Sequence, residues 1–388
     1  MASHSDFFGE RNSQTVLKHG VLTRYAHYFA GRAGRATVGR VAFIDGYAGA
    51  GRYDDGSPGS PLLLASEAKR AEAMGRNVKL AFVEPDQRIR RRLERSLGEA
   101  DIRPNSLVSK PFDTALEGLL EQFADHALLV FVDPFGLAVD QATLLRLFGK
   151  STRRQPIDVL YHFSLSTVAR MGRAGISDIE TAAHNALRLD EALGSVNWRE
   201  EFAGSDERGK STEAAMAVAR RFSASVTAES DFASTSIPVR QRPGQLPKYL
   251  LILFSKDPQA HWDFADQASM AYVDWLHHCD TIDYQANLQA REASGIQTLF
   301  EDPAPDRSNV EALLESEAIG YLTTRVVDII HRHRRIRLID RIEDVYGEML
   351  GRARIRHLRK AIRALHTEGL IDDNGVGDFH CRNIQWIE

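Results

Sequence analysis

The sequence predicts an α/β fold built on a mostly parallel β-sheet, and two observations carry this prediction. First, short apolar runs recur through the first half of the chain, and longer stretches with helical periodicity separate them. Second, these apolar runs are continuous instead of alternating, which is typical of strands buried on both faces. Strands that alternate with helices form a parallel sheet covered by helices on both sides.

Four strands are expected in the first half of the chain. They are the runs RVAFIDGY from Arg40, KLAFVEPD from Lys79, LLVFVDPFG from Leu128 and IDVLYHFS from Ile157. Helical patterns lie between the strands, for example over Pro61 to Ala73 and over Gln87 to Leu97.

Residues 166–228 are Ala-rich and helical in pattern, which predicts a helical insertion. Strand patterns return in FASTSIPVR, from Phe232, and in KYLLILFSKD, from Lys248, with the turn QRPGQLP between them. These two runs predict an antiparallel hairpin at the sheet edge. A mostly parallel sheet that ends in such a hairpin is typical of Rossmann-like class I methyltransferases. We therefore expect one domain of this kind over residues 1–300.

The polar, Pro-rich segment EDPAPDRS, residues 301–308, is the best candidate for a linker. Beyond it the pattern predicts three helices and a hairpin around the Asn374-Gly375 turn, which is a winged-helix-like arrangement over residues 309–388. The third helix would present a row of basic residues as a candidate nucleic-acid-binding face. This row consists of Arg352, Arg354, Arg356, Arg359, Lys360 and Arg363.

The charge distribution limits where nucleic acid can bind. The whole chain has a net charge of −4, so only a local patch would attract phosphates. Residues 331–363 hold eleven Lys or Arg and four Asp or Glu, a local excess of seven positive charges. The alternative is a solvated basic face that contacts protein.

Cysteine usage and hydropathy indicate a cytoplasmic protein. The chain has two cysteines, too few for a disulfide framework, and its polar start does not resemble a signal peptide. No apolar run approaches the ~20 residues that span a bilayer. The adjacent His277, His278 and Cys279 and the pair His331 and His333 have poor spacing for a metal, so we expect no metal site.

The Gly-rich segment after the first strand is the strongest candidate for a cofactor loop. A strand that ends in an acid and turns through small residues lets the backbone approach a ligand, at the position where nucleotide-type ligands bind in open α/β sheets. An acid at the strand end itself suits a ligand with a methionine moiety better than a diphosphate. The alternative is a tight turn without a ligand. The candidate cofactor-binding residues are Asp45, Gly46, Tyr47, Ala48, Gly49 and Gly51.

Two further acids are candidate cofactor ligands. Glu84 ends the second strand, where a carboxylate can accept hydrogen bonds from both ribose hydroxyls. Asp113 follows the strand candidate SLVSKPF and would face an adenine amino group. The alternative in both cases is a solvated acid at the end of a strand.

The segment VDPFG supplies the candidate catalytic residues Asp133, Pro134 and Phe135. Amino-group methyltransferases often carry Asp-Pro-Pro-aromatic at this strand end, where the acid accepts hydrogen bonds from the target amine and the ring stacks on a planar substrate. Methyl transfer depends mainly on alignment and desolvation. This chain has one proline, so Phe135 directly follows Pro134. The alternative is a strand terminator without catalysis.

Taken together, these motifs resemble the bacterial three-Cys-motif partner family. The resemblance runs almost end to end, through VLKHGVLTRYAHYF, FIDGYAGAG, FVEPD, VDPFG, LYHFSLSTVAR, LDEALGSVNW and KYLLILFSKD. It implies a class I methyltransferase fold, S-adenosylmethionine as cofactor, and a partner protein with a three-cysteine motif, similar to a radical-SAM protein. Two departures stand out: Tyr47 replaces the family's frequent Phe, and Pro111 takes the place of the usual third-strand acid.

Three functions compete at this point. The first is methyl transfer from S-adenosylmethionine to nucleic acid, to a base amine. The second is a catalytically silent methyltransferase fold that binds a partner protein, which the single proline after Asp133 favours. The third and weakest is a nuclease, which would need clustered carboxylates for divalent metal, and no such cluster has persuasive spacing.

Overall fold

The protein is described by a computed structural model that covers residues 13–134, 136, 139–152, 154–175, 180–194, 196–203, 208–294 and 303–387. Its contacts divide into two compact units. The sheet unit is Leu22–Asp257, and the C-terminal unit is Met1–Val21 with Pro258–Glu388. None of the helices in the described ranges is long and apolar enough to cross a membrane.

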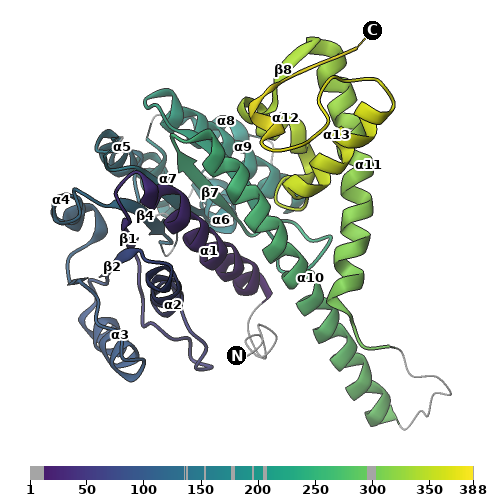
Figure 1. Cartoon of the computed structure of the whole chain (residues 1–388). Coiled ribbons are helices and arrows are strands. Elements are labelled where there is room, and N and C mark those ends of the chain that lie inside the picture. Colours follow the sequence, from purple (N-terminus) through teal and green to yellow (C-terminus); the bar gives the residue numbers. More distant parts are fainter. Residues whose placement is uncertain are drawn as a thin grey trace. The chain divides into compact units, whose positions relative to one another are not determined.

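A seven-stranded sheet forms the centre of the sheet unit, in the order β3-β2-β1-β4-β5-β7-β6 (Figure 1). Strands β1 to β5 are parallel, whereas β7 is antiparallel to β5 and to β6. This mixed sheet confirms the four expected strands, the edge hairpin and the Rossmann-like α/β class. The strands are β1 (Arg40–Asp45), β2 (Asn77–Val83), β3 (Ser106–Val108), β4 (Ala127–Val132), β5 (Ile157–Phe163), β6 (Ala233–Val239) and β7 (Tyr249–Ser255).

The helices between the strands follow the predicted alternation. They are α2 (Ser60–Ala73), α3 (Gln87–Glu99), α4 (Phe112–Gln122) and α5 (Gln141–Gly149), whereas α1 (Ser13–Arg32) and a 3-10 helix at Ala33–Arg35 precede β1. The expected helical insertion at residues 166–228 is confirmed in its described part. It consists of α6 (Leu165–Gly175), α7 (Glu180–Leu193), α8 (Trp198–Phe202) and α9 (Arg208–Ala228).

Aspartates begin the helices that follow two of the strands. Asp86 caps α3 by accepting hydrogen bonds from the backbone N–H groups of Arg88 and Ile89. Asp140 caps α5 in the same way through the N–H of Thr143. Such caps satisfy backbone donors that have no partner within the helix. They also fix the start of each helix close to the carboxyl edge of the sheet.

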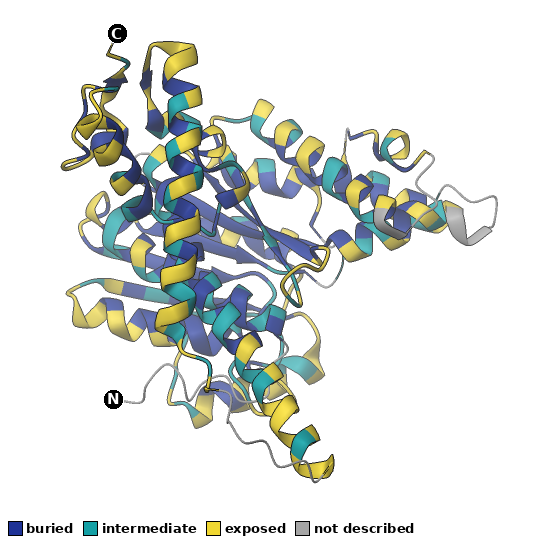
Figure 2. Ribbon diagram, turned by 90° about the vertical axis from the view of Figure 1, so that its right-hand side faces the viewer, coloured by how far each residue is buried: buried dark blue, intermediate teal, exposed yellow. Residues whose placement is uncertain are grey.

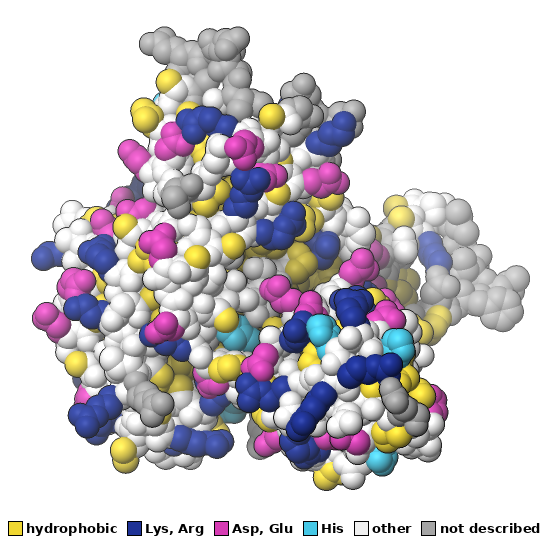
Figure 3. Space-filling view, turned by 90° about the horizontal axis from the view of Figure 1, so that it is seen from above, with side chains coloured by type: hydrophobic (Ala, Val, Ile, Leu, Met, Phe, Trp, Pro, Cys, Tyr) yellow, Lys and Arg dark blue, Asp and Glu magenta, His cyan; other side chains and the backbone are white. Residues whose placement is uncertain are grey.

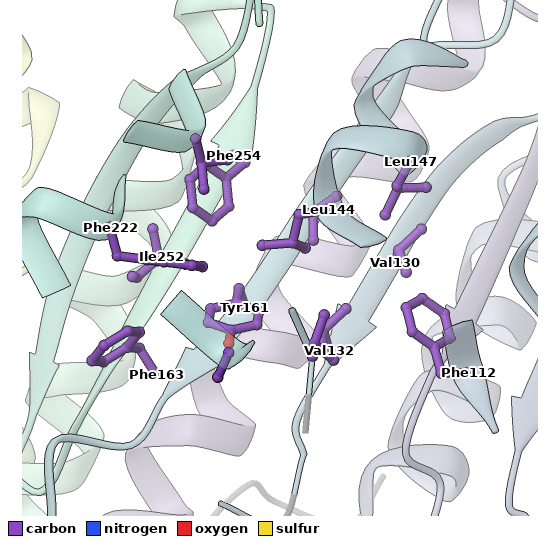
Figure 4. Packing of buried hydrophobic residues seen from close by; sticks show 14 of the residues in the cluster. Phe112, Val130, Val132, Leu144, Leu147, Tyr161, Phe163, Phe222, Ile252 and Phe254 are labelled. Carbon is purple, nitrogen blue, oxygen red and sulfur yellow. The ribbon is translucent and has the colours of Figure 1, made fainter. Parts of the chain in front are cut away.

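The sheet is buried on both faces, as its continuous apolar runs predict (Figure 2). On one face, alternate strand residues such as Val132, Tyr161 and Ile252 join a single apolar cluster with Leu144 of α5 and Phe222 of α9 (Figure 4). Helix α2 packs on β1 and β2. The insertion therefore shares the core of the sheet instead of standing apart from it.

A buried polar network ties α1 to β5 and β7. The carboxylate of Asp158, which is 3% exposed, accepts hydrogen bonds from the hydroxyl of Tyr25 at 2.6 Å and from Ser255 at 2.5 Å. It also accepts one from the Arg32 guanidinium at 2.6 Å, and Arg32 in turn pairs with Asp257. A buried carboxylate is tolerated only with such partners.

The C-terminal unit has a core of its own, which includes Trp262 and Ala265 of α10. The predicted domain boundary near residue 300 lies between α10 and α11, whereas the contacts group α10 with α11. The elements beyond α1 are α10 (Pro258–Ser294), α11 (Arg307–His333), β8 (Arg335–Arg337), α12 (Ile342–Tyr346), α13 (Ile355–Thr367) and β9 (Asn383–Gln385), with 3-10 helices at Leu338–Arg341, Gly347–Met349 and Phe379–Cys381.

Two local expectations for this unit need correction. The linker expected at residues 301–308 is shorter in its described part, because Asp306 already caps α11 through the N–H of Ser308. The expected hairpin around Asn374-Gly375 is not a regular ladder. Strand β9 pairs with β8, and a single bridge joins Ile371 to Trp386. The side chain of Asp373 accepts the N–H of Gly375 and pairs with Arg382, so side chains replace ladder hydrogen bonds near the turn.

The network around Asp158 leads to a stability prediction. Asp158→Asn should lower the free energy of unfolding by about 3 kcal/mol, because it leaves Arg32 without its buried partner. Urea denaturation measures the change. Asp125→Asn is the matched control, because its pair with Arg40 is exposed and should contribute about 1 kcal/mol or less. Equal losses in the two variants would contradict a special role for the buried network.

Candidate functional site

The candidate loop starts where β1 ends, between its two neighbouring strands. Asp45 lies opposite Phe82 of β2 and Phe131 of β4 in the parallel register. Its side chain is fully buried, and Oδ1 accepts the N–H of Tyr47 at 3.1 Å. The carboxylate therefore holds the first turn of the loop.

Backbone hydrogen bonds attach the loop to both neighbouring strands. The N–H of Gly46 donates to the carbonyl of Phe131 at 2.9 Å, and the N–H of Ala48 donates to the carbonyl of Val83 at 3.0 Å. A Cβ on Gly46 would lie 2.9 Å from the Phe112 ring, so that position has no room for a side chain. The first half of the loop is thus fixed by the sheet.

The two glycines that follow, Gly49 and Gly51, have different surroundings. Both have a positive φ, +61° at Gly49 and +78° at Gly51, a conformation that favours glycine. A Cβ on Gly51 would lie 3.0 Å from atoms of Leu93 and Ser96, so Gly51 lets α3 pack closely. A Cβ on Gly49 would have no described atom within 4 Å, so the space above Gly49 is open.

Glu84 lies beside this open space. It is 6% exposed, and its carboxylate accepts the N–H of Asp86 at 2.9 Å. Burial raises the pKa of Glu84 above its ordinary value of 4.5, although the backbone N–H groups of Asp86 and Gly49 and the charge of Arg90 act in the opposite direction. The structure therefore brings together Glu84 and Gly49, which the sequence separates by a helix.

Asp113 lies in the first turn of α4 instead of at the end of β3, and it is exposed. Phe112, the preceding residue, has its ring centroid 6.0 Å from that of Tyr47. Burial raises the pKa of Tyr47, and the charges of Asp113 and Asp140 raise it further. Asp113 is thus close to the candidate loop, although through a helix and not a strand.

The candidate catalytic segment follows β4. Oδ1 of Asp133 lies 3.3 Å from Nδ1 of His162 on β5, and both side chains are mostly buried, 19% and 13% exposed. The imidazole also contacts Tyr249, with ring centroids 4.2 Å apart. Pro134 is buried. Phe135 lies outside the described residues.

The sequence did not single out three residues near this segment. His162 and Tyr161 end the apolar run of β5, and Asp140 caps α5. Burial raises the pKa of Tyr161, and the charges of Tyr47 and Asp140 act in the same direction. The available signal was a pair of polar-tipped aromatic residues near the carboxyl end of a strand whose one other polar residue is Asp158.

The basic residues predicted to bind nucleic acid lie on or next to α13, and most of them have partners inside the C-terminal unit. Arg356 pairs with Glu311 at 2.6 Å and with Glu315 at 3.0 Å. Further partners of this row are Glu317 for Arg352, Asp266 for Arg354, the Gly375 carbonyl for Arg359 and Glu315 for Lys360. Arg363 is exposed.

Comparison with known proteins finds likeness of structure alone. No protein-family model and no curated protein matches the chain. The plantazolicin methyltransferase BpumL, in complex with SAH, has 10% identity and a TM-score of 0.31, over 64% of this chain and 86% of that one. The plantazolicin methyltransferase BamL, in complex with a desmethylPZN analogue and SAH, has 10% identity and a TM-score of 0.29, over 63% and 85%.

A third similar structure is the O-methyltransferase from a trans-AT PKS multienzyme of Brevibacillus brevis, in complex with S-adenosyl-L-homocysteine. It has 10% identity and a TM-score of 0.27, over 74% of this chain and 87% of that one. At such identities the likeness concerns the α/β fold, and the chemistry of the site depends on this chain's own residues.

The raised pKa of Glu84 predicts how stability changes with pH. The Glu84 carboxyl titrates near 4.5 in the unfolded chain and at a higher pH in the folded protein. Its contribution to the stability of the folded state is therefore greatest below pH 4.5 and is lost as the pH rises through the folded pKa. Glu84→Gln removes this loss. Urea denaturation between pH 4 and 8 should show the variant gaining stability relative to the wild type as pH rises. Parallel curves would contradict the prediction.

Proposed function

We propose that the chain is an S-adenosylmethionine-dependent methyltransferase. The observation that carries this proposal is the meeting of three acids at one sheet edge. Asp45 ends β1, and Glu84 and Asp133 directly follow β2 and β4. These three strands are neighbours in parallel register. In open α/β sheets, ligands bind outside these carboxyl ends, where the strand order reverses. Here β1 is the strand from which the order reverses.

The residues at this edge fit the proposed cofactor. The open space above Gly49 leaves room for a ligand against the backbone. Glu84 is a buried carboxylate beside that space, and two ribose hydroxyls would supply the donors that lower the energy of its ionised form. Asp45 would hold the loop that faces the methionine moiety, and Asp113 would lie on the adenine side. The cofactor would supply an electrophilic methyl group on a sulfonium.

Asp133 and His162 would prepare the nucleophile, which we propose to be a base amine of a nucleic acid. The Asp133 carboxylate would accept an amine N–H and so orient the nitrogen lone pair. The nitrogen gains a methyl group and loses a proton, and the Asp133–His162 pair at 3.3 Å would accept that proton. Because Phe135 is the aromatic residue of the motif Asp133-Pro134-Phe135, its ring would stack on the base.

The proposal extends to the C-terminal unit and to cellular context. A winged-helix-like domain at residues 309–388 is supported by the order helix, strand, two helices, strand, with β8 paired to β9. We also propose a cytoplasmic protein that works with a three-Cys-motif partner. The single proline after Asp133 favours the alternative, in which the fold is catalytically silent and serves that partner.

Calorimetry with S-adenosylmethionine tests the cofactor site. The wild type should bind, and Asp45→Ala should abolish binding. Gly49→Ala should weaken binding at least tenfold, or about 1.4 kcal/mol, because its methyl group would occupy the open space. Gly56→Ala is the matched control, since Gly56 also has a positive φ and no described atom within 4 Å of a Cβ. Absence of binding to the wild type would refute the proposal.

Transfer of a tritiated methyl group into RNA or DNA from a deletion strain tests catalysis. Asp133→Asn should lower incorporation by about 100-fold or more while cofactor affinity is retained. His162→Gln should lower it less and alter the pH profile of the rate. Asp125→Asn is the control, because Asp125 pairs with His126 just before β4, away from the carboxyl edge of the sheet. Incorporation that does not depend on Asp133 would contradict the assigned role.

The same experiment separates the two proposed functions. Cofactor binding without incorporation into any nucleic-acid pool, together with co-purification of a partner protein, would support the silent module. Incorporation dependent on Asp133 would refute it.

A further inference from the structure

The basic side chains of the C-terminal unit fall into two groups, those with carboxylate partners and those without. On helix α13, Arg356 and Lys360 belong to the first group, because Glu311 and Glu315 of α11 pair with them. These side chains hold α11 and α13 together. They are poorly available for phosphates, since each contact would first have to break an ion pair.

The second group includes Arg332 and Arg335, which lie where α11 ends and β8 begins. Residues 331–337, HRHRRIR, contain four arginines and no acid, and one of these arginines, Arg337, pairs with Asp340. Arg332, His333 and Arg335 are exposed, and in the described part of the chain no carboxylate pairs with Arg332 or Arg335. Figure 3 shows Lys, Arg and His side chains on the exposed face of this unit. Cations without partners are free to neutralise phosphates.

A surface pocket adjoins these cations. It is lined by Arg334, Asp372, Gln385, Trp386 and Ile387. The Trp386 backbone N–H donates to the Arg334 carbonyl at 2.9 Å, and the edge of the His331 ring meets the indole with centroids 5.3 Å apart. The Asp372 carboxylate accepts the N–H of Gln385 at 2.7 Å and so forms part of the wall. Arg334 and Trp386 thus share the wall of the pocket, and Trp386 is partly exposed.

The backbone at Arg334 supports a role for its side chain. Arg334 follows α11 with a φ of +62°, and its N–H donates to the carbonyl of Ile330 at 2.7 Å. Glycine is the usual residue at such a helix end, because it adopts a positive φ without strain. The backbone conformation alone therefore does not account for an arginine at this position, which lines the wall of the pocket.

We propose that this pocket binds a base of single-stranded nucleic acid, with Arg332 and Arg335 neutralising the flanking phosphates. An aromatic ring on which a base stacks, beside a row of cations that follows the backbone, is how proteins bind single strands. The inference deepens the proposed function, since it gives the nucleic-acid substrate a docking site on β8 and β9 in place of α13.

Tryptophan fluorescence reports on this pocket directly. Trp198, Trp262 and Trp275 are at most 1% exposed, so quenching by a bound base reports Trp386. Titration of the full chain, without cofactor, with a mixed-sequence 12-nucleotide single strand should quench this fluorescence. Anisotropy of the same labelled strand gives the affinity. Trp386→Leu should weaken binding roughly 5- to 150-fold, the loss of one stacked base.

Two arginine variants separate binding from folding. Arg332→Ala should leave stability in urea unchanged, because the exposed Arg332 has no carboxylate partner among the described residues, and yet should weaken binding. Arg335→Ala should weaken binding and reduce the slope of log affinity against log salt by about 0.7. Lys360→Ala on α13 is the matched control and should change neither affinity nor slope.

Several results would overturn the proposal. One is a loss of affinity in Lys360→Ala equal to that in Arg335→Ala. Another is wild-type affinity in Trp386→Leu, and a third is equally tight binding of a duplex or of polyglutamate. If the protein binds S-adenosylmethionine but not the single-stranded nucleic acid, the proposal for the pocket alone is refuted. If the protein binds the single-stranded nucleic acid but not the cofactor, the methyltransferase proposal alone is refuted.

Discussion

The parallel pairing of β1 with both β2 and β4 is the constraint on which the candidate site depends. Because the three strands run in one direction, their carboxyl ends meet at one edge, and Asp45 stands opposite Phe82 and Phe131. The loop after β1 then takes its shape from both neighbours, through hydrogen bonds to the carbonyls of Val83 and Phe131. A slip of either strand would move Glu84 or Asp133 away from the loop.

Strand β5 carries both a buried structural carboxylate and a residue of the candidate site. Asp158 and His162 point to the same face, because side chains alternate along a strand. Asp158, near the beginning, has three donors around it and is 3% exposed, so its role is structural. His162, near the carboxyl end, is more exposed and contacts Asp133. The surroundings of Asp158 and His162 therefore differ because the two residues lie near opposite ends of β5.

The sequence predicted what depends on local pattern. Continuous apolar runs predicted β1, β2, β4 and β5, and a Pro/Gly turn predicted the hairpin of β6 and β7. It missed His162 because its partner Asp133 follows another strand, β4, and pairing between strands is not encoded by periodicity. It placed Asp113 near a strand end because nothing local shows that α4 begins at Phe112. The candidate loop after β1 was predictable, since an acid, glycines and an adjacent strand end are all local features.

The basic row of α13 shows why a charge count is a weak guide to binding. Periodicity put Arg356 and Lys360 on one helix, but their partners Glu311 and Glu315 lie on α11, about 45 residues earlier. Burying or pairing a cation removes the counterion release that drives binding to phosphates. The shorter segment at residues 331–337 has fewer positive charges, yet it includes arginines without carboxylate partners in the described chain. Attraction for a nucleic acid should therefore follow the cations that the fold leaves unpaired.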